Sequence, residues 1–411
     1  MEVLIEEFKG GYWAVALDEG RLDGIEIDSP HEDVRWASVY AGFVRRVDKA
    51  GDAAIVEIED GVFGYLHAKD VYVIDNDRVA HKNKENIAKA LETGSRVIVQ
   101  AKEGTVDLPY KDDDGSNESK YPRLSMDIAL PGRYLIFTPH QKDNRISKRI
   151  RNKKLRSDLV QMLDEMTGCE GIILRAAALN TQTDMLKAES DQLNNMWDRI
   201  EENSFVNKPK MLHQGPNAIE RLLSDAAGAP IENISVVTME HLQAAQEWCE
   251  RFAPDLITKI QPVEIPMAQA DLGLFEFRDI IGQIEALFHP YCLLQHGGNI
   301  IIQETTALTA IDVNRAGDDR SNLAINTEAG IALARQMRLR NLGGMIVADF
   351  LRMRTGKEKD KLLEALAAAF ENDPCTVQIH GFTNLCLIEM TRKRRSPSLR
   401  NRIDNIEFVE E

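Results

Sequence analysis

The chain has 411 residues, 43% of them hydrophobic and 28% charged, with a formal net charge of −16 at pH 7. These values are ordinary for a globular protein of several domains, and the acidic balance argues against a protein that coats nucleic acid indiscriminately. The sequence has no apolar run long enough to span a membrane, and its acidic start does not resemble a signal peptide, so we expect a cytoplasmic protein. The five cysteines are scattered without a CxxC pair, which favours reduced thiols over disulfides or structural zinc.

The N-terminal part of the chain is predicted to consist of short strands. Residues 1–35 alternate around an Asp18-Glu19-Gly20 turn and are too few to form a domain, so we expect them to join a sheet from elsewhere. Residues 39–125 contain closely spaced strands and glycine turns, which fit a small closed barrel of the OB type. Such barrels bind single-stranded nucleic acid on one face. Tyr65 could stack a base there or be a half-buried strand aromatic.

The middle of the chain is basic and then alternates helices with strands. Between Lys142 and Arg156 the one acid is Asp143, so this run is either a solvated helix face or a track for phosphates. A buried strand then leads to Arg175, and residues 182–206 have a helical apolar stripe that we expect to pack in a core. Residues 217–287 alternate helix and strand without an acidic cluster, which indicates a structural role.

Residues 297–350 predict a strand, a helix and a second strand. Asp312 and Asn314 fall at period two, so both project from one face of the first strand. Thr327 is available as the N-cap of the helix, Gly343-Gly344 as its stop, and the second strand ends at Asp349. Parallel strands joined by a helix end at the same edge of the sheet, so we expect Asp312 and Asp349 to lie close together.

Two adjacent carboxylates repel each other unless one takes up a proton or a cation binds between them. Mg²⁺ prefers one or two carboxylates, several waters and substrate phosphate oxygens. The alternative is that Asp312 and Asp349 are N-caps or turn formers. Cations surround the same stretch, which suits a polyanion whose phosphodiester reacts. They are Arg315, Arg335, Arg338, Arg340, Arg392, Lys393, Arg394, Arg395, Arg400 and Arg402.

Three motifs carry a resemblance. AIDVN, RQMRLRNLGGMIVADF and LIEMTRKRRSPSL occur in this order and are similar to the signatures of the ribonuclease E/G family. The resemblance extends through nearly the whole chain, because IEIDSPHEDVRWASVYAGFVRRV near the N-terminus is also similar to the family. It implies that Asp312 and Asp349 bind magnesium and that Asn314 orients the carboxylate or the attacking water.

The resemblance also implies a multidomain α+β fold. The expected parts are an RNase H-like subdomain (1–35 and 220–287), an OB-fold (S1-type) RNA-binding domain (36–125), a 5′-sensor-like region (126–219), a DNase I-like catalytic α/β subdomain (288–400) and a tail (401–411).

The expected RNA-contacting residues are Tyr65, Lys120, Arg315, Arg338, Arg340, Arg392 and Arg394. Gly132, Ile136 and Arg175 correspond to a sensor of the RNA 5′-phosphate. Ala176 stands where the family has threonine, so we expect an altered sensor. Ile55 stands where the family often has phenylalanine.

We therefore expect an endoribonuclease that uses Mg²⁺, with Mn²⁺ as a substitute. Single-stranded RNA would be cut to leave 5′-phosphate and 3′-hydroxyl ends. The alternatives are an RNA-binding regulator of the same fold with little turnover and a DNA-directed nuclease. The family's CPxC zinc motif does not occur, so we expect no structural zinc, and a homodimer through other contacts stays open.

Overall fold

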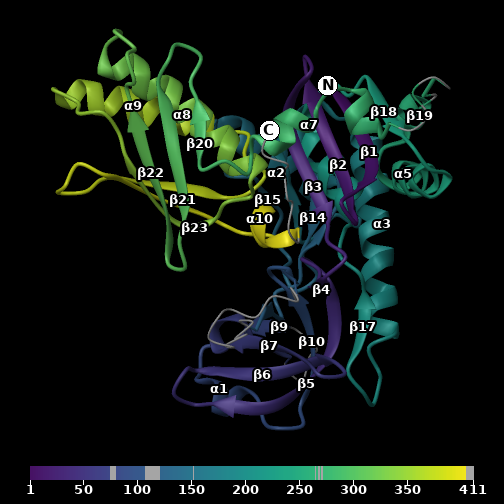
Figure 1. The fold of residues 1–411 in the computed structure, drawn as a ribbon. Coiled ribbons are helices and arrows are strands. Elements are labelled where there is room, and N and C mark those ends of the chain that lie inside the picture. Colours follow the sequence, from purple (N-terminus) through teal and green to yellow (C-terminus); the bar gives the residue numbers. More distant parts are fainter. Residues whose placement is uncertain are drawn as a thin grey trace. The chain divides into compact units, whose positions relative to one another are not determined.

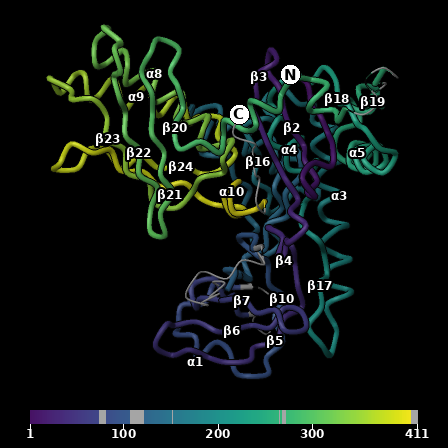
Figure 2. Tube along the Cα trace, viewed as in Figure 1, coloured from purple at the N-terminus to yellow at the C-terminus, as the bar shows by residue number. Residues whose placement is uncertain are grey.

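The computed structural model describes residues 1–74, 80–106, 121–150, 152–263, 265–266, 269 and 272–403. The chain divides into two compact units. The first contains Met1–Pro30, Asn233–Met239 and Gln261–Glu411, and the second contains His31–Glu232 and Glu240–Ile260. Helices and strands are mixed in each unit, so the α+β class is confirmed (Figures 1 and 2). The division into four named subdomains stays a prediction.

The N-terminal strands form one sheet of the first unit. Its order is β19-β18-β1-β2-β3, and β18 runs parallel to β1. The β2–β3 turn has Glu19 and Gly20 at φ 48° and 78°, as the predicted turn requires. The expectation that these strands join a strand from beyond residue 220 is confirmed. The strands are β1 (Glu2–Phe8), β2 (Gly11–Asp18), β3 (Arg21–Asp28), β18 (Asn233–Val236) and β19 (Ile260–Pro262).

Short helices pack against this sheet. Trp13 is fully buried and lies edge-on to Phe275, with ring centroids 6.2 Å apart. Glu6 accepts hydrogen bonds from the backbone N–H groups of Leu274 (2.7 Å) and Phe275 (2.9 Å), so its carboxylate satisfies the first turn of α6. The helices are α6 (Leu274–Phe277), α7 (Ile281–Glu285) and α10 (Leu399–Arg402).

The second unit contains the predicted closed barrel. Its ring is β10-β12-β7-β6-β5, closed by the pairing of β10 with β5, and β17 adds to β5. Val44, Val56, Leu66, Val99 and Leu124 fill its interior without exposure to solvent. The strands are β5 (Val39–Asp48), β6 (Ala53–Glu59), β7 (Val62–His67), β10 (Arg96–Ala101), β12 (Arg123–Ser125) and β17 (Lys210–His213). Shorter elements are β4 (Glu32–Val34), η1 (Ala68–Asp70), β8 (Tyr72–Ile74), β9 (Ala80–Lys82), α1 (Ile87–Ala90) and β11 (Thr105–Val106).

A four-stranded sheet and several helices complete the second unit. The sheet order is β13-β14-β16-β15. Leu186, Leu193, Trp197 and Ile200 of α3 are buried, as its predicted apolar stripe requires. The strands are β13 (Leu130–Pro131), β14 (Leu135–Phe137), β15 (Arg145–Ile146) and β16 (Ile172–Leu174). The helices are α2 (Lys153–Glu165), η2 (Ala176–Asn180), α3 (Thr183–Glu202), α4 (Ala218–Asp225), η3 (Ala226–Gly228), α5 (Met239–Phe252) and η4 (Pro254–Lys259).

A six-stranded sheet of the first unit contains the predicted strand–helix–strand segment. Its order is β20-β21-β22-β23-β25-β24, with β22 and β23 parallel and joined through α8. The strands are β20 (Tyr291–Leu293), β21 (Asn299–Glu304), β22 (Leu308–Asn314), β23 (Gly344–Asp349), β24 (Val377–Phe382) and β25 (Ile388–Arg392). The helices are α8 (Asn322–Leu339) and α9 (Gly356–Ala369), which lie together beside the sheet in Figure 1.

Helices α8 and α9 cover one face of this sheet. Leu333 of α8 and Leu366 of α9 pack in one core with Ile311, Ile346 and Ile388 of the strands. Residues at the alternate strand positions are exposed or half-buried on the other face, which we call the open face. Of the described helices, none has the length and apolar character that crossing a membrane requires.

The bounds of α8 differ from the prediction. The helix begins at Asn322, and its N-cap is Ser321, whose hydroxyl accepts a hydrogen bond from the N–H of Ala324 at 3.2 Å. Thr327 was therefore the wrong N-cap and lies inside the helix. The helix ends at Leu339, before the two glycines that were predicted to stop it.

Candidate active site on the open face of the sheet

Asp312 and Asp349 are paired directly across two strands. Asp312 ends the pairing of β22 with β23, and its partner in the parallel ladder is Asp349. Adjacent strands lie about 4.8 Å apart, so the two Cα atoms are close neighbours. Both residues are exposed on the open face, while their strand neighbours Ile311 and Ala348 are buried. The predicted proximity is confirmed, and the role of the two carboxylates stays a prediction.

Asn314 orients one of these carboxylates. Its side-chain N–H donates to Oδ2 of Asp312 at 3.0 Å and to Oδ1 of Asn299, on the neighbouring strand, at 3.4 Å. The amide nitrogen is thus committed within the sheet, and the amide oxygen is the part of this side chain that can accept a hydrogen bond from a water or a substrate.

The donor set suits a hard divalent cation. Within the described part of the chain, neither Asp312 nor Asp349 forms an ion pair with a lysine or arginine. Over the same residues, no group of three or more His, Cys, Asp or Glu is placed to hold a metal. Two carboxylates on an exposed face leave the remaining coordination positions to water and phosphate oxygens, which is the arrangement Mg²⁺ prefers.

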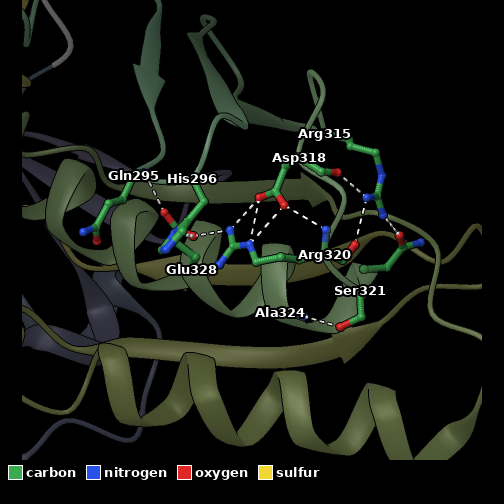
Figure 3. A network of polar contacts seen from close by, with 9 residues as sticks. Gln295, His296, Arg315, Asp318, Arg320, Ser321, Ala324 and Glu328 are labelled. Atoms are coloured by element: carbon green, nitrogen blue, oxygen red, sulfur yellow. Dashed lines mark hydrogen bonds and ion pairs between the residues drawn. The ribbon is translucent and has the colours of Figure 1, made fainter.

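The loop that follows β22 is braced by charged side chains (Figure 3). Arg320 lies between Asp318 and Glu328, and its Nε is 3.0 Å from Oδ1 of Asp318. The hydrogen bond from Arg320 lowers the pKa of Asp318 to about 2. Glu328 also accepts from the ring of His296 (3.0 Å) and from the N–H of Gln295 (2.6 Å), which attaches the β20–β21 turn to α8.

Arg315 belongs to the same brace. Its guanidinium donates to the carbonyl oxygens of Asp318 and Arg320, the latter at 2.8 Å, and to Oδ1 of Asn322. Arg315 is the residue directly after Asn314, the last residue of β22. Its hydrogen bonds therefore fix the strand end that carries the candidate site. The guanidinium was predicted to contact RNA, and the structure commits much of it to the loop instead.

Arg340 and Arg392 do not fit the prediction that they contact RNA directly. Their exposed fractions are 7% and 2%. Arg392 is 3.0 Å from Oδ2 of Asp373, whose side chain is equally buried, and donates to the carbonyl of Leu342 at 2.8 Å. Arg340 donates to backbone carbonyls, including that of His289 at 2.6 Å. Burial makes both of them internal braces, and this corrects the sequence-based assignment.

Arg338 and Arg394 each have internal partners but keep part of the side chain exposed. Arg338 donates through Nε to the carbonyl of Asp23 at 3.0 Å and pairs with the carboxylate of the same residue, which ties α8 to β3. Arg394 donates to the carbonyl of Gly343 at 2.8 Å and has 38% of its side chain exposed. Of these two, Arg394 has more surface to offer a phosphate.

Two exposed arginines close to Asp349 were not predicted. Arg352 and Arg354 leave the sheet at the edge where β23 ends, and both are exposed. The loop is held by α8, because Asn322 donates to the carbonyl of Arg352 at 2.9 Å and Asn326 donates to that of Leu351 at 2.7 Å. The alternation LRMR after Asp349 could have revealed them, since Met353 between them is buried.

The barrel of the second unit exposes aromatic side chains as a separate candidate surface. Tyr65 is half-buried, pairs across the strands with Ile55, and donates from its hydroxyl to Asp48 at 3.4 Å. Phe63, on the same face of β7, and Tyr121 were not predicted, and their ring centroids lie 6.0 Å apart. Lys120 lies outside the described residues.

The residues expected to sense a 5′-phosphate are brought together in the second unit. Arg175 donates to the carbonyl oxygens of Gly132 (2.8 Å) and Arg133 (3.1 Å) and pairs with Asp225 at 3.3 Å. Ile136 is half-buried on the neighbouring β14. Arg175 therefore already has internal partners, including an acid that a phosphate would have to displace.

Glu189 of α3 is a further acid at this place that the sequence did not reveal. It is 3% exposed, and its Oε1 accepts from the backbone N–H groups of Tyr134 and Leu135, each at 2.9 Å. A Cβ at Gly132 would lie 2.1 Å from this oxygen, so glycine is needed for the close approach. Burial raises the pKa of Glu189 to about 7, although the two backbone donors and Arg175 act in the opposite direction.

Comparisons with known proteins agree with these features. A profile of the Ribonuclease E/G family matches residues 129–395. The chain is 31% identical over 399 residues to a Ribonuclease E of Haemophilus influenzae, covering 94% of this chain and 41% of that protein. It is 29% identical over 401 residues to the Ribonuclease G of Escherichia coli K12, covering 95% of this chain and 79% of that protein. The chain thus spans less than half of the Ribonuclease E relative and most of the Ribonuclease G relative.

Proposed function

Because the chain belongs to the Ribonuclease E/G family, we propose that it is an endoribonuclease acting on single-stranded RNA in RNA processing or decay. The observation that supports this most directly is the pairing of Asp312 with Asp349 on an exposed sheet face. A metal-dependent nuclease needs accessible oxygen ligands for its ion, and buried carboxylates would not reach a polymer.

In this proposal Asp312 and Asp349 would hold Mg²⁺, and Mn²⁺ would replace it. When bound, the ion supplies an activated water and neutralises charge on the leaving 3′ oxygen, which would give 5′-phosphate and 3′-hydroxyl ends. Asn314 holds Asp312 in one orientation through its 3.0 Å hydrogen bond and offers its amide oxygen to the attacking water.

Exposed arginines of the same unit would bind the phosphates of the substrate. Arg352 and Arg354 follow Asp349 closely in the chain, and Arg394 keeps an exposed side chain at the end of β25. A guanidinium group can bind a phosphate through two parallel hydrogen bonds. These residues replace the buried Arg340 and Arg392 as the expected RNA contacts.

The barrel would bind single-stranded RNA through half-buried aromatic side chains on one face of β7. Tyr65 and Phe63 can each stack a base, which is worth about 1–3 kcal/mol per base. Recognition of a 5′-monophosphate by Arg175 has weaker support, because Asp225 and Glu189 already lie beside it.

The test of the proposed function uses Asp312→Asn and Asp349→Asn. Each variant is expected to slow Mg²⁺-dependent cleavage of a labelled single-stranded RNA by more than about 100-fold, because changes to the partners of metal ligands alone cost about 10–100-fold. RNA affinity is expected to stay within a few fold. The matched control is Glu364→Gln, which removes an exposed carboxylate of α9 on the opposite side of the sheet. Cleavage that persists in Asp312→Asn would refute the site.

The second candidate function is an RNA-binding regulator of the same fold. The internal acids beside Arg175 and the aliphatic Ile55 on the barrel favour it. Incubation of the wild-type protein with RNA in Mg²⁺ and in EDTA separates the two functions. RNA binding without a metal-dependent product would identify the regulator.

A further inference from the structure

The edge of the active-site sheet exposes large apolar side chains. Tyr291 and Leu293 of β20 are 45% and 73% exposed, whereas Cys292 between them packs against the core. A group of large exposed apolar side chains beside a candidate site marks a binding surface more often than a single exposed leucine does.

The strand register places Tyr291 in line with the two carboxylates. Tyr291 pairs with Ile301, Ile301 pairs with Asp312, and Asp312 pairs with Asp349. Directly opposed residues of neighbouring strands project to the same face, so the four side chains form one row. Two strand spacings separate Tyr291 from Asp312, which is about 10 Å between their Cα atoms.

The tyrosine ring is held in a defined place. It stacks on the exposed ring of His289, with centroids 5.4 Å apart and an interplanar angle of 21°. The buried guanidinium of Arg340 donates to the carbonyl oxygens of His289 (2.6 Å) and Tyr291 (3.4 Å). Arg340 therefore fixes the backbone beneath both rings, although it does not reach the open face itself.

We propose that the His289–Tyr291 ring pair is a stacking platform for one base next to the scissile phosphate. The inference rests on the proposed ribonuclease function. About 10 Å along the row separates the Cα atoms of Tyr291 and Asp312, so a base on the rings and a phosphate held at Asp312 would belong to one RNA strand. Ile301, between them, offers an apolar contact to the sugar. Every base has an aromatic face, so the platform would position the strand without selecting a particular base.

The experiment compares Tyr291→Ala, Tyr291→Phe and the control Ile331→Ala, which truncates an exposed apolar side chain of α8 away from the open face, on RNAs of one sequence. Each RNA carries a single abasic nucleotide at a different position around the cleavage site. Tyr291→Ala is expected to lower kcat/KM about 5- to 150-fold on the intact RNA, whereas Tyr291→Phe stays within about twofold because it keeps the ring. At one abasic position the kcat/KM of the wild type should fall by the same factor. The kcat/KM of Tyr291→Ala should not fall further on that RNA. Ile331→Ala should behave as wild type.

The same comparison by fluorescence anisotropy in EDTA tests the platform without turnover. If the wild type binds RNA but does not cut it, the proposed function fails. The difference in RNA affinity between wild type and Tyr291→Ala then still tests the platform. Equal behaviour of Tyr291→Ala and wild type on every RNA overturns the platform. The platform is also overturned if Tyr291→Ala has an effect of equal size at all abasic positions and changes the molar mass of the protein in light scattering. The face would then be a contact between two copies of the chain.

Discussion

Arg392 provides a direct test of whether an arginine in the C-terminal basic segment supports the fold or binds RNA. Its guanidinium lies 3.1 and 3.0 Å from the two carboxylate oxygens of Asp373 and 2.8 Å from the carbonyl of Leu342. Both members of the ion pair have 1% of their side chains exposed. Arg392→Met would leave the Asp373 carboxylate buried without its counter-ion.

The expected cost follows from this geometry. Removing one partner of a buried pair costs about 3–5 kcal/mol of unfolding free energy, because the other charge stays desolvated. Asp373 keeps one hydrogen bond, from the N–H of Cys375 at 2.8 Å, which does not replace the lost charge. The double variant with Asp373→Asn should recover part of the loss, since it removes the uncompensated charge.

The assay is urea unfolding with hydrogen exchange of the β23 and β25 amides as the local probe. The control is Arg394→Met, whose side chain is 38% exposed and 3.7 Å from Glu304, a pair worth about 0–1 kcal/mol. RNA affinity of folded Arg392→Met should match the wild type. Unchanged stability together with weaker RNA binding would refute the structural reasoning.

Two further predictions concern Glu189 and Asn314. The pKa of Glu189 is raised by burial to about 7, above the ordinary 4.5, so its contribution to stability is full below pH 4.5 and is lost as the pH rises through 7. In Glu189→Gln the unfolding free energy should therefore fall less between pH 5 and 8 than in the wild type, by about 1–3 kcal/mol. Urea titrations across this pH range measure the fall. A fall as steep as that of the wild type would contradict the prediction. Asn314→Ala removes the 3.0 Å hydrogen bond to Asp312 and should lower kcat about 10–100-fold at unchanged RNA affinity. Steady-state kinetics that show a change in KM alone would count against it.

The position of the two carboxylates could be predicted because it depends on local rules. Period-two alternation places Asp312 and Asn314 on one face, and a helical crossover brings the ends of parallel strands together. The structure adds that Asp312 and Asp349 are direct partners in the ladder. Sequence alone does not fix this register to one residue.

The errors arose where distant partners decide the outcome. A run of arginines reveals charge but not burial, so Arg340 and Arg392 were assigned to RNA although they donate to the carbonyls of His289 and Leu342, 51 and 50 residues away. Glu189 is separated from Leu135 by 54 residues, and no local pattern joins them. Thr327 resembled an N-cap, but the hydroxyl of Ser321 accepts from the N–H of Ala324 in the first turn, so the helix begins six residues earlier.

The parallel ladder between β22 and β23 has a consequence for insertions and deletions in this family member. Side chains alternate along a strand, so deleting one residue within β23 would turn the Asp349 carboxylate toward the apolar packing beneath α8. Catalysis and folding would then fail together. A change of length in the loops does not reverse the faces of a strand in this way, although the loop after β22 still holds the strand end through Arg315.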